Sequence, residues 1–162
     1  MGIKTIGVIG AGTMGNGIVH VAALSGYNII HNDINQELLD KGFAIIQKNM
    51  NRQLNKGIIS EKDMDKALKN IDVTLRIEDF ANSDIVIEAA SENPTIKKDI
   101  FTKLSDTCHP ETILASNTSS ISITKIASVT KHPEKVIGMH FMNPVPIMQL
   151  VEVIRGNLTS DG

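Results

Sequence analysis

The hydrophobic positions of the chain alternate between short continuous runs and longer stretches with helical spacing. Residues 4–9 form the first apolar run, and residues 18–24 carry apolar side chains at helical spacing before Ser25-Gly26 ends the pattern. A second apolar run covers residues 27–31. A strand, a turn, a helix and a strand in this order predict the βαβ unit of a parallel sheet.

Residues 35–70 interrupt this alternation with two helical patterns. Gly57 separates the two, and before it apolar side chains repeat on one helical face at Leu38, Leu39, Phe43, Ile46, Met50 and Leu54. Ser60, with Asp63 three residues later, resembles a capping box and predicts a second helix. The segment is longer than a minimal crossover between parallel strands, so we interpret it as an inserted helical hairpin.

Apolar runs and helical patterns continue to alternate over the rest of the chain. Strands are expected at residues 73–75, 84–89, 112–116, 136–140 and 149–154, and helices at residues 94–107 and 123–130. This order predicts a doubly wound α/β fold with a mostly parallel, Rossmann-type sheet. Because a chain of 162 residues suits one domain, we expect residues 1–162 to form a single domain with the hairpin at residues 35–70.

The composition narrows the function classes. The formal net charge is −2 and there is no Trp, which argues against a nucleic-acid-binding surface. No apolar run is long enough to cross a bilayer, and the amino-terminal run lacks the pattern of a signal peptide. The single cysteine, Cys108, cannot form an internal disulfide and fits a reducing compartment, so we expect a cytoplasmic protein.

The first strand leads into the glycine pattern Gly10-x-Gly12-x-x-Gly15, which opens a helix and has Asp33 about twenty residues further on. In this context the first glycine permits a tight turn, the second lets the backbone approach a pyrophosphate, and the third allows helix and strand to pack closely. The helix amino terminus offers unpaired N–H groups to the phosphates. The pattern therefore predicts cofactor contacts from Gly10, Ala11, Gly12, Thr13, Met14 and Gly15.

Asp33 follows the second strand, where a carboxylate accepts hydrogen bonds from the adenosine ribose hydroxyls. A carboxylate at this place repels a 2′-phosphate, and no Arg follows it, so NAD is favoured over NADP as the cofactor. The alternative interpretation is a glycine-rich turn with a helix-capping Asp.

Polar residues also gather at the ends of the later strands, where ligands bind in a doubly wound sheet. They lie at residues 91–93, at residues 116–120 and at His140 with Asn143. For residues 116–120 a turn with a helix cap explains the Ser, Thr and Asn side chains equally well. His140 alone fits a core or rim histidine, but Glu152 on the next extended run could fix its tautomer and stabilise an imidazolium.

Four stretches together resemble the 3-hydroxyacyl-CoA dehydrogenases, most closely the bacterial 3-hydroxybutyryl-CoA dehydrogenases. They are the glycine loop, IEAASEN at residues 87–93, SNTSS at residues 116–120 and GMHFMNPVP at residues 138–146, which is followed by Glu152. The last stretch is the most specific, and the resemblance extends over essentially the whole chain.

The resemblance implies roles for individual residues. His140 matches the family's general base, Glu152 its partner carboxylate, and Ser119 a serine that hydrogen-bonds the reacting oxygen beside the nicotinamide. Further cofactor contacts are implied at Ala90, Glu92, Lys97, Asn117 and Asn143. Lys97 also fits a solvated helix lysine. The implied reaction transfers a hydride between NAD and C3 of a short-chain 3-hydroxyacyl-CoA (3-hydroxybutyryl-CoA or acetoacetyl-CoA) in fatty-acid or butyrate metabolism.

The resemblance also implies an all-helical carboxyl-terminal domain that covers the acyl pocket and forms a homodimer. The present chain stops at Gly162, just after the last predicted strand, so turnover by this piece alone stays an open question. The alternatives are an NAD-binding module without chemistry and a β-hydroxyacid dehydrogenase with the same glycine loop. The latter does not account for the string at residues 140–146.

The inserted hairpin carries a basic stripe. Lys48, Arg52 and Lys56 lie four residues apart, so a helix places them on one face. Lys41 lies near the same face, and no carboxylate on the helix is four residues from any of the three. The stripe is a candidate contact for the phosphates of a CoA substrate, and a merely solvated face is the alternative.

Overall fold

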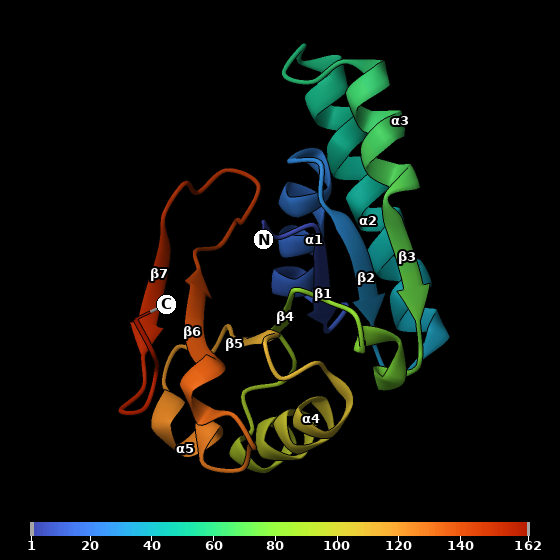
Figure 1. Cartoon of the computed structure of the whole chain (residues 1–162). Helices are drawn as coiled ribbons and strands as arrows, with labels where there is room; N and C mark the ends of the chain where they lie inside the picture. The colour runs from blue at the N-terminus through green and yellow to red at the C-terminus, as the bar shows by residue number, and fades with distance from the viewer. Residues whose placement is uncertain (1, 162) are drawn as a thin grey trace.

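The computed structural model describes residues 2–161 and contains a central sheet with helices on both faces (Figure 1). Its strands are β1 (Thr5–Ile9), β2 (Asn28–Asn32), β3 (Ile71–Thr74), β4 (Ile85–Glu88), β5 (Ile113–Ser116), β6 (Val136–Phe141) and β7 (Val151–Arg155). They are arranged in the order β3-β2-β1-β4-β5-β6-β7. Strands β1 to β6 run parallel and β7 pairs antiparallel with β6, which confirms the predicted doubly wound, mostly parallel sheet.

The helices are divided between the two faces of the sheet. One face carries α1 (Thr13–Leu24), α2 (Gln36–Asn55) and α3 (Glu61–Lys69), and the other carries α4 (Pro94–Thr107) and α5 (Ile123–Ala127). The short 3-10 helices η1 (Ile77–Phe80) and η2 (Pro133–Lys135) add to the predicted elements. Within residues 2–161 no helix is long and apolar enough to cross a membrane.

The central strands are apolar on both sides because both of their faces are buried. In β4, Ile85 and Ile87 belong to the core beneath α1, together with Ile18 of that helix. Val86, between them, points to the opposite face and packs in the core that contains Phe101 of α4. This alternation explains why the strand appears in the sequence as a continuous apolar run.

The helical hairpin at residues 35–70 is present as α2 and α3. The Asp63 N–H donates to Ser60 Oγ at 3.1 Å, and the Ser60 N–H donates to Asp63 Oδ2 at 3.1 Å, so the predicted capping box is confirmed. Gly57 ends the preceding turn with a φ of +69°. Ile46 and Met50 of α2 are buried in the core shared with α1.

Some predicted boundaries are wrong because strand pairing and side-chain hydrogen bonds determine where an element begins or ends. Strand β3 begins at Ile71 instead of Val73, since Ile71 pairs with Ile29 of β2. Helix α5 ends at Ala127 and does not reach Thr130, whose hydroxyl donates to the Ala127 carbonyl at 2.8 Å. Strand β7 begins at Val151, which pairs with Phe141 at the end of β6, and not at residue 149 as predicted.

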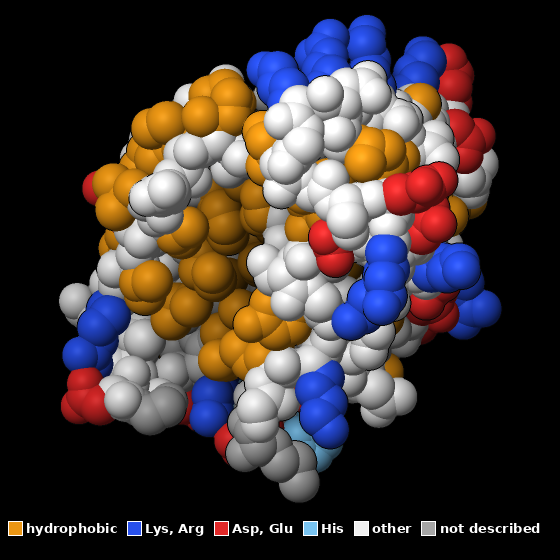
Figure 2. All heavy atoms as spheres, turned by 90° about the horizontal axis from the view of Figure 1, so that it is seen from above, with side chains coloured by type: hydrophobic (Ala, Val, Ile, Leu, Met, Phe, Trp, Pro, Cys, Tyr) orange, Lys and Arg blue, Asp and Glu red, His pale blue; other side chains and the backbone are white. Residues whose placement is uncertain are grey.

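An apolar groove lies between α1 and strands β6 and β7, and Figure 2 shows hydrophobic side chains lining this hollow. Its walls include Val21, Ala22, Met139, Phe141, Val151 and Val153. Residues 2–161 therefore leave an apolar part of this face of the sheet exposed.

Candidate active site

The glycine loop joins β1 to α1 where the strand order reverses, since β1 lies between β2 and β4. Gly10 has a φ of +108°, a conformation that favours glycine. A Cβ at Gly15 would lie 1.9 Å from the Gly10 carbonyl oxygen, so α1 can approach β1 this closely only with glycine there. A Cβ at Gly12 would have nothing within 4 Å, so this residue faces open space.

Helix α1 presents its amino terminus to a groove. Gly12 is the N-cap and provides no side-chain cap, so the first N–H groups of the helix remain available to an anion. Gly12, Thr13 and Met14 line this groove, which has a volume of about 690 Å³ and also borders Asp33 and Ala90. The groove thus links the predicted phosphate contacts to the predicted ribose acceptor.

Asp33 both fixes the glycine loop and keeps acceptor capacity. Its Oδ2 accepts from the Ala11 N–H at 2.7 Å, and its Oδ1 accepts from the Ile34 N–H at 2.7 Å. Because a carboxylate has about four acceptor sites, each oxygen can still accept from a ribose hydroxyl. The N-cap of α2 is Asn35, whose side chain accepts from the Glu37 N–H at 2.7 Å, so the alternative of a helix-capping Asp33 is wrong.

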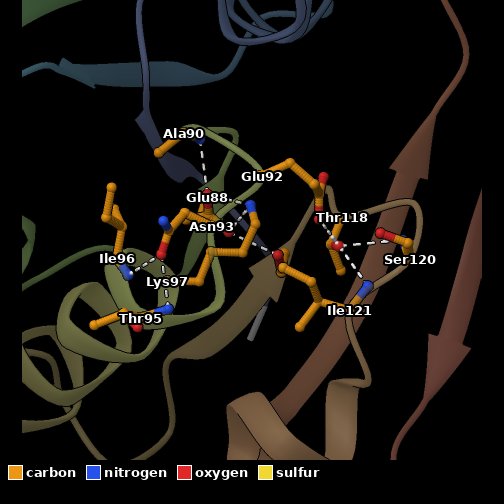
Figure 3. Close-up of polar contacts among 11 residues, drawn as sticks. Glu88, Ala90, Glu92, Asn93, Thr95, Ile96, Lys97, Thr118, Ser120 and Ile121 are labelled. Atoms are coloured by element: carbon orange, nitrogen blue, oxygen red, sulfur yellow. Dashed lines mark hydrogen bonds and ion pairs between the residues drawn. The ribbon is translucent and has the colours of Figure 1, made fainter.

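A buried polar centre lies at the end of β4, and the sequence analysis missed it. Glu88 is fully buried, and its carboxylate accepts from the Ala90 N–H at 2.7 Å and from Lys97 Nζ at 2.7 and 2.9 Å (Figure 3). It also accepts from Ser116 Oγ at 2.6 Å. Lys97 is 1% exposed, so the interpretation of this residue as a solvated helix lysine is wrong. Its ammonium group, predicted as a cofactor contact, is directed at Glu88.

A second set of contacts lies beside this centre. Thr118 donates to the Glu92 carboxylate, which joins the loop after β4 to the loop after β5 (Figure 3). Thr118 Oγ1 also accepts from the Ile121 N–H at 3.0 Å, so part of the polar run at residues 116–120 does form a capped turn. Asn117 Oδ1 accepts from the Phe141 N–H at 2.8 Å and ties this loop to β6.

His140 and Glu152 form a pair across two strands. The antiparallel register places them directly opposite each other on β6 and β7, and His140 Nδ1 lies 2.8 Å from Glu152 Oε2. The His140 side chain is 27% exposed, so it is neither a core histidine nor fully solvated. Because Nδ1 faces the carboxylate, Nε2 is the ring nitrogen that remains for a proton from a substrate.

Ser119 and Asn143 lie on exposed loops that follow two neighbouring strands. Ser119 follows β5 and Asn143 follows β6, and the two strands are parallel neighbours whose carboxyl ends meet at the same edge. Val145 is buried, and a Cβ at Gly17 would lie 2.7 Å from the Val145 Cβ, so the segment after β6 is anchored on α1. This anchoring fixes the position of the loop that carries Asn143.

The basic stripe is exposed on the hairpin. Lys48 and Arg52 lie on α2, and Lys56 is its C-cap, one residue beyond the helix. Lys41 forms an ion pair with Glu37 at 2.7 Å, so its expected contribution to an unpaired stripe is wrong. The reason is the i−4 carboxylate, which the other three residues lack.

Known proteins match the chain over nearly its full length. The family model described as 3-hydroxyacyl-CoA dehydrogenase, NAD binding domain, matches residues 5–162. A 3-hydroxybutyryl-CoA dehydrogenase of Bradyrhizobium diazoefficiens is 50% identical over 159 residues, which cover 98% of this chain and 54% of that protein. The crystal structure of (S)-3-hydroxybutyryl-CoA dehydrogenase from Ralstonia eutropha is 46% identical with a TM-score of 0.96, covering 99% of this chain and 56% of that one. The chain thus spans about half the length of these relatives.

Proposed function

Because the chain belongs to the 3-hydroxyacyl-CoA dehydrogenase family and corresponds to its NAD-binding domain, we propose that it binds NAD and supplies the acid–base pair for oxidation at C3 of a short-chain 3-hydroxyacyl-CoA. The observation that carries the proposal is the His140–Glu152 pair, which lies on the sheet that also carries the glycine loop. The substrates inferred are 3-hydroxybutyryl-CoA and acetoacetyl-CoA, in fatty-acid or butyrate metabolism.

The described residues fit NAD as the cofactor. The uncapped start of α1 and the open Gly12 suit a pyrophosphate, and Asp33 has spare acceptor sites for the adenosine ribose. The same carboxylate disfavours the 2′-phosphate of NADP. When bound, NAD⁺ supplies the hydride acceptor for the reaction L-3-hydroxyacyl-CoA + NAD⁺ ⇌ 3-oxoacyl-CoA + NADH + H⁺.

Residues of the chain itself accept the proton that the 3-hydroxyl group loses. His140 Nε2 accepts the proton of the 3-hydroxyl group while the Glu152 carboxylate stabilises the imidazolium that forms. The exposed Ser119 hydroxyl, at the end of the neighbouring strand, is proposed to donate a hydrogen bond to the reacting oxygen. Glu92, Asn117 and Asn143 are proposed to line the nicotinamide side.

Two measurements test the proposal. A titration of the chain with NADH gives its affinity for the cofactor, and the steady-state rate of NADH oxidation by acetoacetyl-CoA gives its turnover. NADH binding with turnover supports the full proposal. Binding without turnover supports the alternative of an NAD-binding module that depends on the other half of its relatives, since the chain spans about half their length. A chain that binds NADPH more tightly than NADH, or neither, contradicts the cofactor assignment.

The proposal extends to the organisation of the protein. We propose that residues 1–162 act as one NAD-binding domain with residues 35–70 as its inserted hairpin, and that a longer form is a cytoplasmic homodimer. The exposed apolar groove between α1 and β7 fits a protein in which further chain covers this face. Size-exclusion chromatography of the chain and of a longer form compares the two oligomeric states.

We also propose that the stripe Lys48, Arg52 and Lys56 contacts the phosphates of CoA. All three side chains are exposed and none has a carboxylate four residues away. Reversing the charge with Arg52→Glu should raise the KM for acetoacetyl-CoA, less so at high salt, and leave a truncated thioester without the nucleotide unaffected. Equal kinetics of wild type and variant on both substrates would leave the stripe as solvated surface.

A further inference from the structure

Glu88 is a buried acid for which the proposed reaction has no direct use. It ends the central strand β4, is 0% exposed, and its carboxylate has four hydrogen bonds from three groups. The Ala90 N–H lies in the loop that follows β4, and the Ser116 hydroxyl lies on the last residue of β5, where the next loop begins. The Glu88 carbonyl also accepts from the Asn117 N–H at 2.8 Å. One residue therefore ties down both loops.

These two loops form one side of the cofactor crevice. Ala90 lines the groove next to the glycine loop, and a Cβ at Gly10 would lie 3.2 Å from the Ala90 nitrogen. The adenosine half belongs to the β1–β3 side, where Asp33 stands, because a doubly wound sheet binds one half of a dinucleotide on each side of the switch in strand order. The loops after β4 and β5 are left to receive the other half.

Lys97 compensates the negative charge of the buried Glu88 carboxylate. Its ammonium reaches Glu88 from α4 and is itself 1% exposed, so the two charges neutralise each other away from water. A buried ion pair is weak support for stability, because apolar residues of similar volume often serve as well. The four directed hydrogen bonds instead point to a role in fixing geometry.

We propose that Glu88 is a positioning residue, which holds the loops at residues 89–93 and 116–120 in the arrangement that receives the nicotinamide half of NAD. Lys97 acts through Glu88 as its counter-charge. The proposal rests on the proposed NAD-binding function. It adds a residue behind the site whose effect is transmitted by the Ala90 amide and the Ser116 hydroxyl.

Two matched double variants separate positioning from stability. Glu88→Gln/Lys97→Met removes both charges but keeps a polar partner for each group, since the amide oxygen can accept from the Ala90 N–H and the amide nitrogen can donate to Ser116 Oγ. Glu88→Met/Lys97→Met removes the charges and both polar partners. Neither variant leaves an unpaired buried charge, so both should stay folded, with the urea midpoint of Glu88→Gln/Lys97→Met close to that of the wild type. The midpoint of Glu88→Met/Lys97→Met should be moderately lower, because the Ala90 N–H and the buried Ser116 hydroxyl lose their acceptor. The single variant Glu88→Gln leaves the buried Lys97 ammonium without a counter-charge and should unfold at a lower urea concentration.

Ligand titrations then give the specific readout. In Glu88→Met/Lys97→Met the Kd for NADH should rise about tenfold, while the Kd for ADP-ribose, which lacks the nicotinamide, should change less than about twofold. Glu88→Gln/Lys97→Met should bind NADH within about twofold of the wild type. Equal NADH affinity in both double variants, or a parallel loss of both ligands, would overturn the positioning role.

Hydrogen exchange without any ligand keeps this inference separate from the proposed function. Glu88→Met/Lys97→Met should lose amide protection at residues 89–93 and 116–121, while β1 to β3 keep theirs. Unchanged protection in the two loops overturns the inference whatever the chain binds. A wild-type chain that protects these amides but does not bind NADH overturns the proposed function and leaves the positioning of the loops by Glu88 intact.

Discussion

At the scale of single residues, the two nitrogens of the His140 ring have different proposed roles: Nδ1 contacts Glu152, and Nε2 accepts the substrate proton. Nδ1 is 2.8 Å from the Glu152 carboxylate, so Nε2 is the proposed proton acceptor. His140→Gln should remove this acceptor without disturbing the glycine loop, because His140 lies on β6 and the loop joins β1 to α1. Turnover of acetoacetyl-CoA should fall by about 10²–10⁴-fold with little change in NADH affinity. Steady-state kinetics and an NADH titration check this. If affinity falls as much as turnover, His140 is a structural residue.

Glu152→Gln is the companion test for the same pair. The amide keeps the size of the side chain but loses the charge that stabilises an imidazolium, so turnover should fall less than in His140→Gln. Glu134 provides a matched control, because it contacts His132 at 3.2 Å in a half-exposed pair that precedes β6, away from the site. Glu134→Gln should leave turnover unchanged.

Asp33 controls the choice between NAD and NADP. Exchanging Asp33 for Ser together with Ile34→Arg removes the repulsion of a 2′-phosphate and adds a guanidinium to bind it, so the preference for NADH over NADPH should fall at least about tenfold. Fluorescence titrations with both cofactors measure the change. Asp99 lines the same groove from α4, and Asp99→Ser is the matched control that should keep the preference.

The residues of the site differ in how readily they can be predicted from the sequence. The glycine loop has a fixed spacing, and the structure gives Gly10, Gly12 and Gly15 the distinct environments that the spacing predicts. Glu88 was missed because its burial depends on the central place of β4 in the sheet, which local pattern does not show. The available signal was an acid at the end of a fully apolar strand, followed nine residues later by Lys97 near the start of the next helix.

At the scale of elements, helix α1 is placed by two glycines with opposite tolerance for a side chain. A Cβ at Gly12 has nothing within 4 Å and its φ of −81° suits alanine, so Gly12→Ala should cost less than about 1 kcal/mol of stability. A Cβ at Gly15 would lie 1.9 Å from a backbone oxygen, so Gly15→Ala should cost about 1–3 kcal/mol or more.

Cofactor binding gives the two glycine variants a second readout. The methyl group of Gly12→Ala fills the space where a pyrophosphate would approach, so NADH affinity should drop at least about tenfold in a normally stable protein. Urea unfolding and NADH titration measure both quantities in each variant. A Gly12→Ala protein with wild-type affinity would show that the phosphates lie elsewhere.

Element types followed from the sequence more readily than element ends. Helix α4 has the predicted bounds because Pro94 suits its first turn and Asn93 caps it, accepting from the Thr95 N–H at 2.9 Å. Helix α5 is shorter than expected because the Thr130 hydroxyl binds the Ala127 carbonyl. Periodicity records which face is buried, whereas ends depend on side-chain hydrogen bonds and on pairing between strands distant in sequence.

At the scale of the whole molecule, the strand order assembles the site. Glu152 reaches His140 because β7 turns back antiparallel along β6, a register that the sequence allows but does not specify. The central β1 has β2 on one side and β4 on the other, so the glycine loop contacts both halves of the crevice. The fold class was therefore predictable from the alternation of strands and helices, while the contacts between its halves required the structure.

Two buried histidines make the stability of the whole molecule sensitive to mild acid. Burial lowers the pKa of His31, an effect partly opposed by its hydrogen bond to the Gly10 carbonyl and by the Asp33 charge. Burial likewise lowers the pKa of His20, an effect partly opposed by the hydrogen bond of its Nε2 to the Gln53 side-chain oxygen. The unfolded chain keeps a histidine pKa near 6.5, so below about pH 6.5 it binds more protons than the folded chain. Stability is then fully present above this pH and is lost as the pH falls, until the folded-state pKa values are passed.

Urea unfolding between about pH 5 and pH 8 should show this loss as a slope of up to about 1.4 kcal/mol per pH unit for each histidine. Replacing His20 and His31 by Leu should flatten the curve in this window, and each single variant should remove part of the slope. His109 is exposed, so His109→Gln is the matched control and should keep the wild-type slope. The carboxylates of lowered pKa are Asp63, Asp84, Glu111 and Glu134, and they contribute only at lower pH because the ordinary pKa values of Asp and Glu are 3.8 and 4.5. A double variant with an unchanged slope would mean that other groups take up the protons.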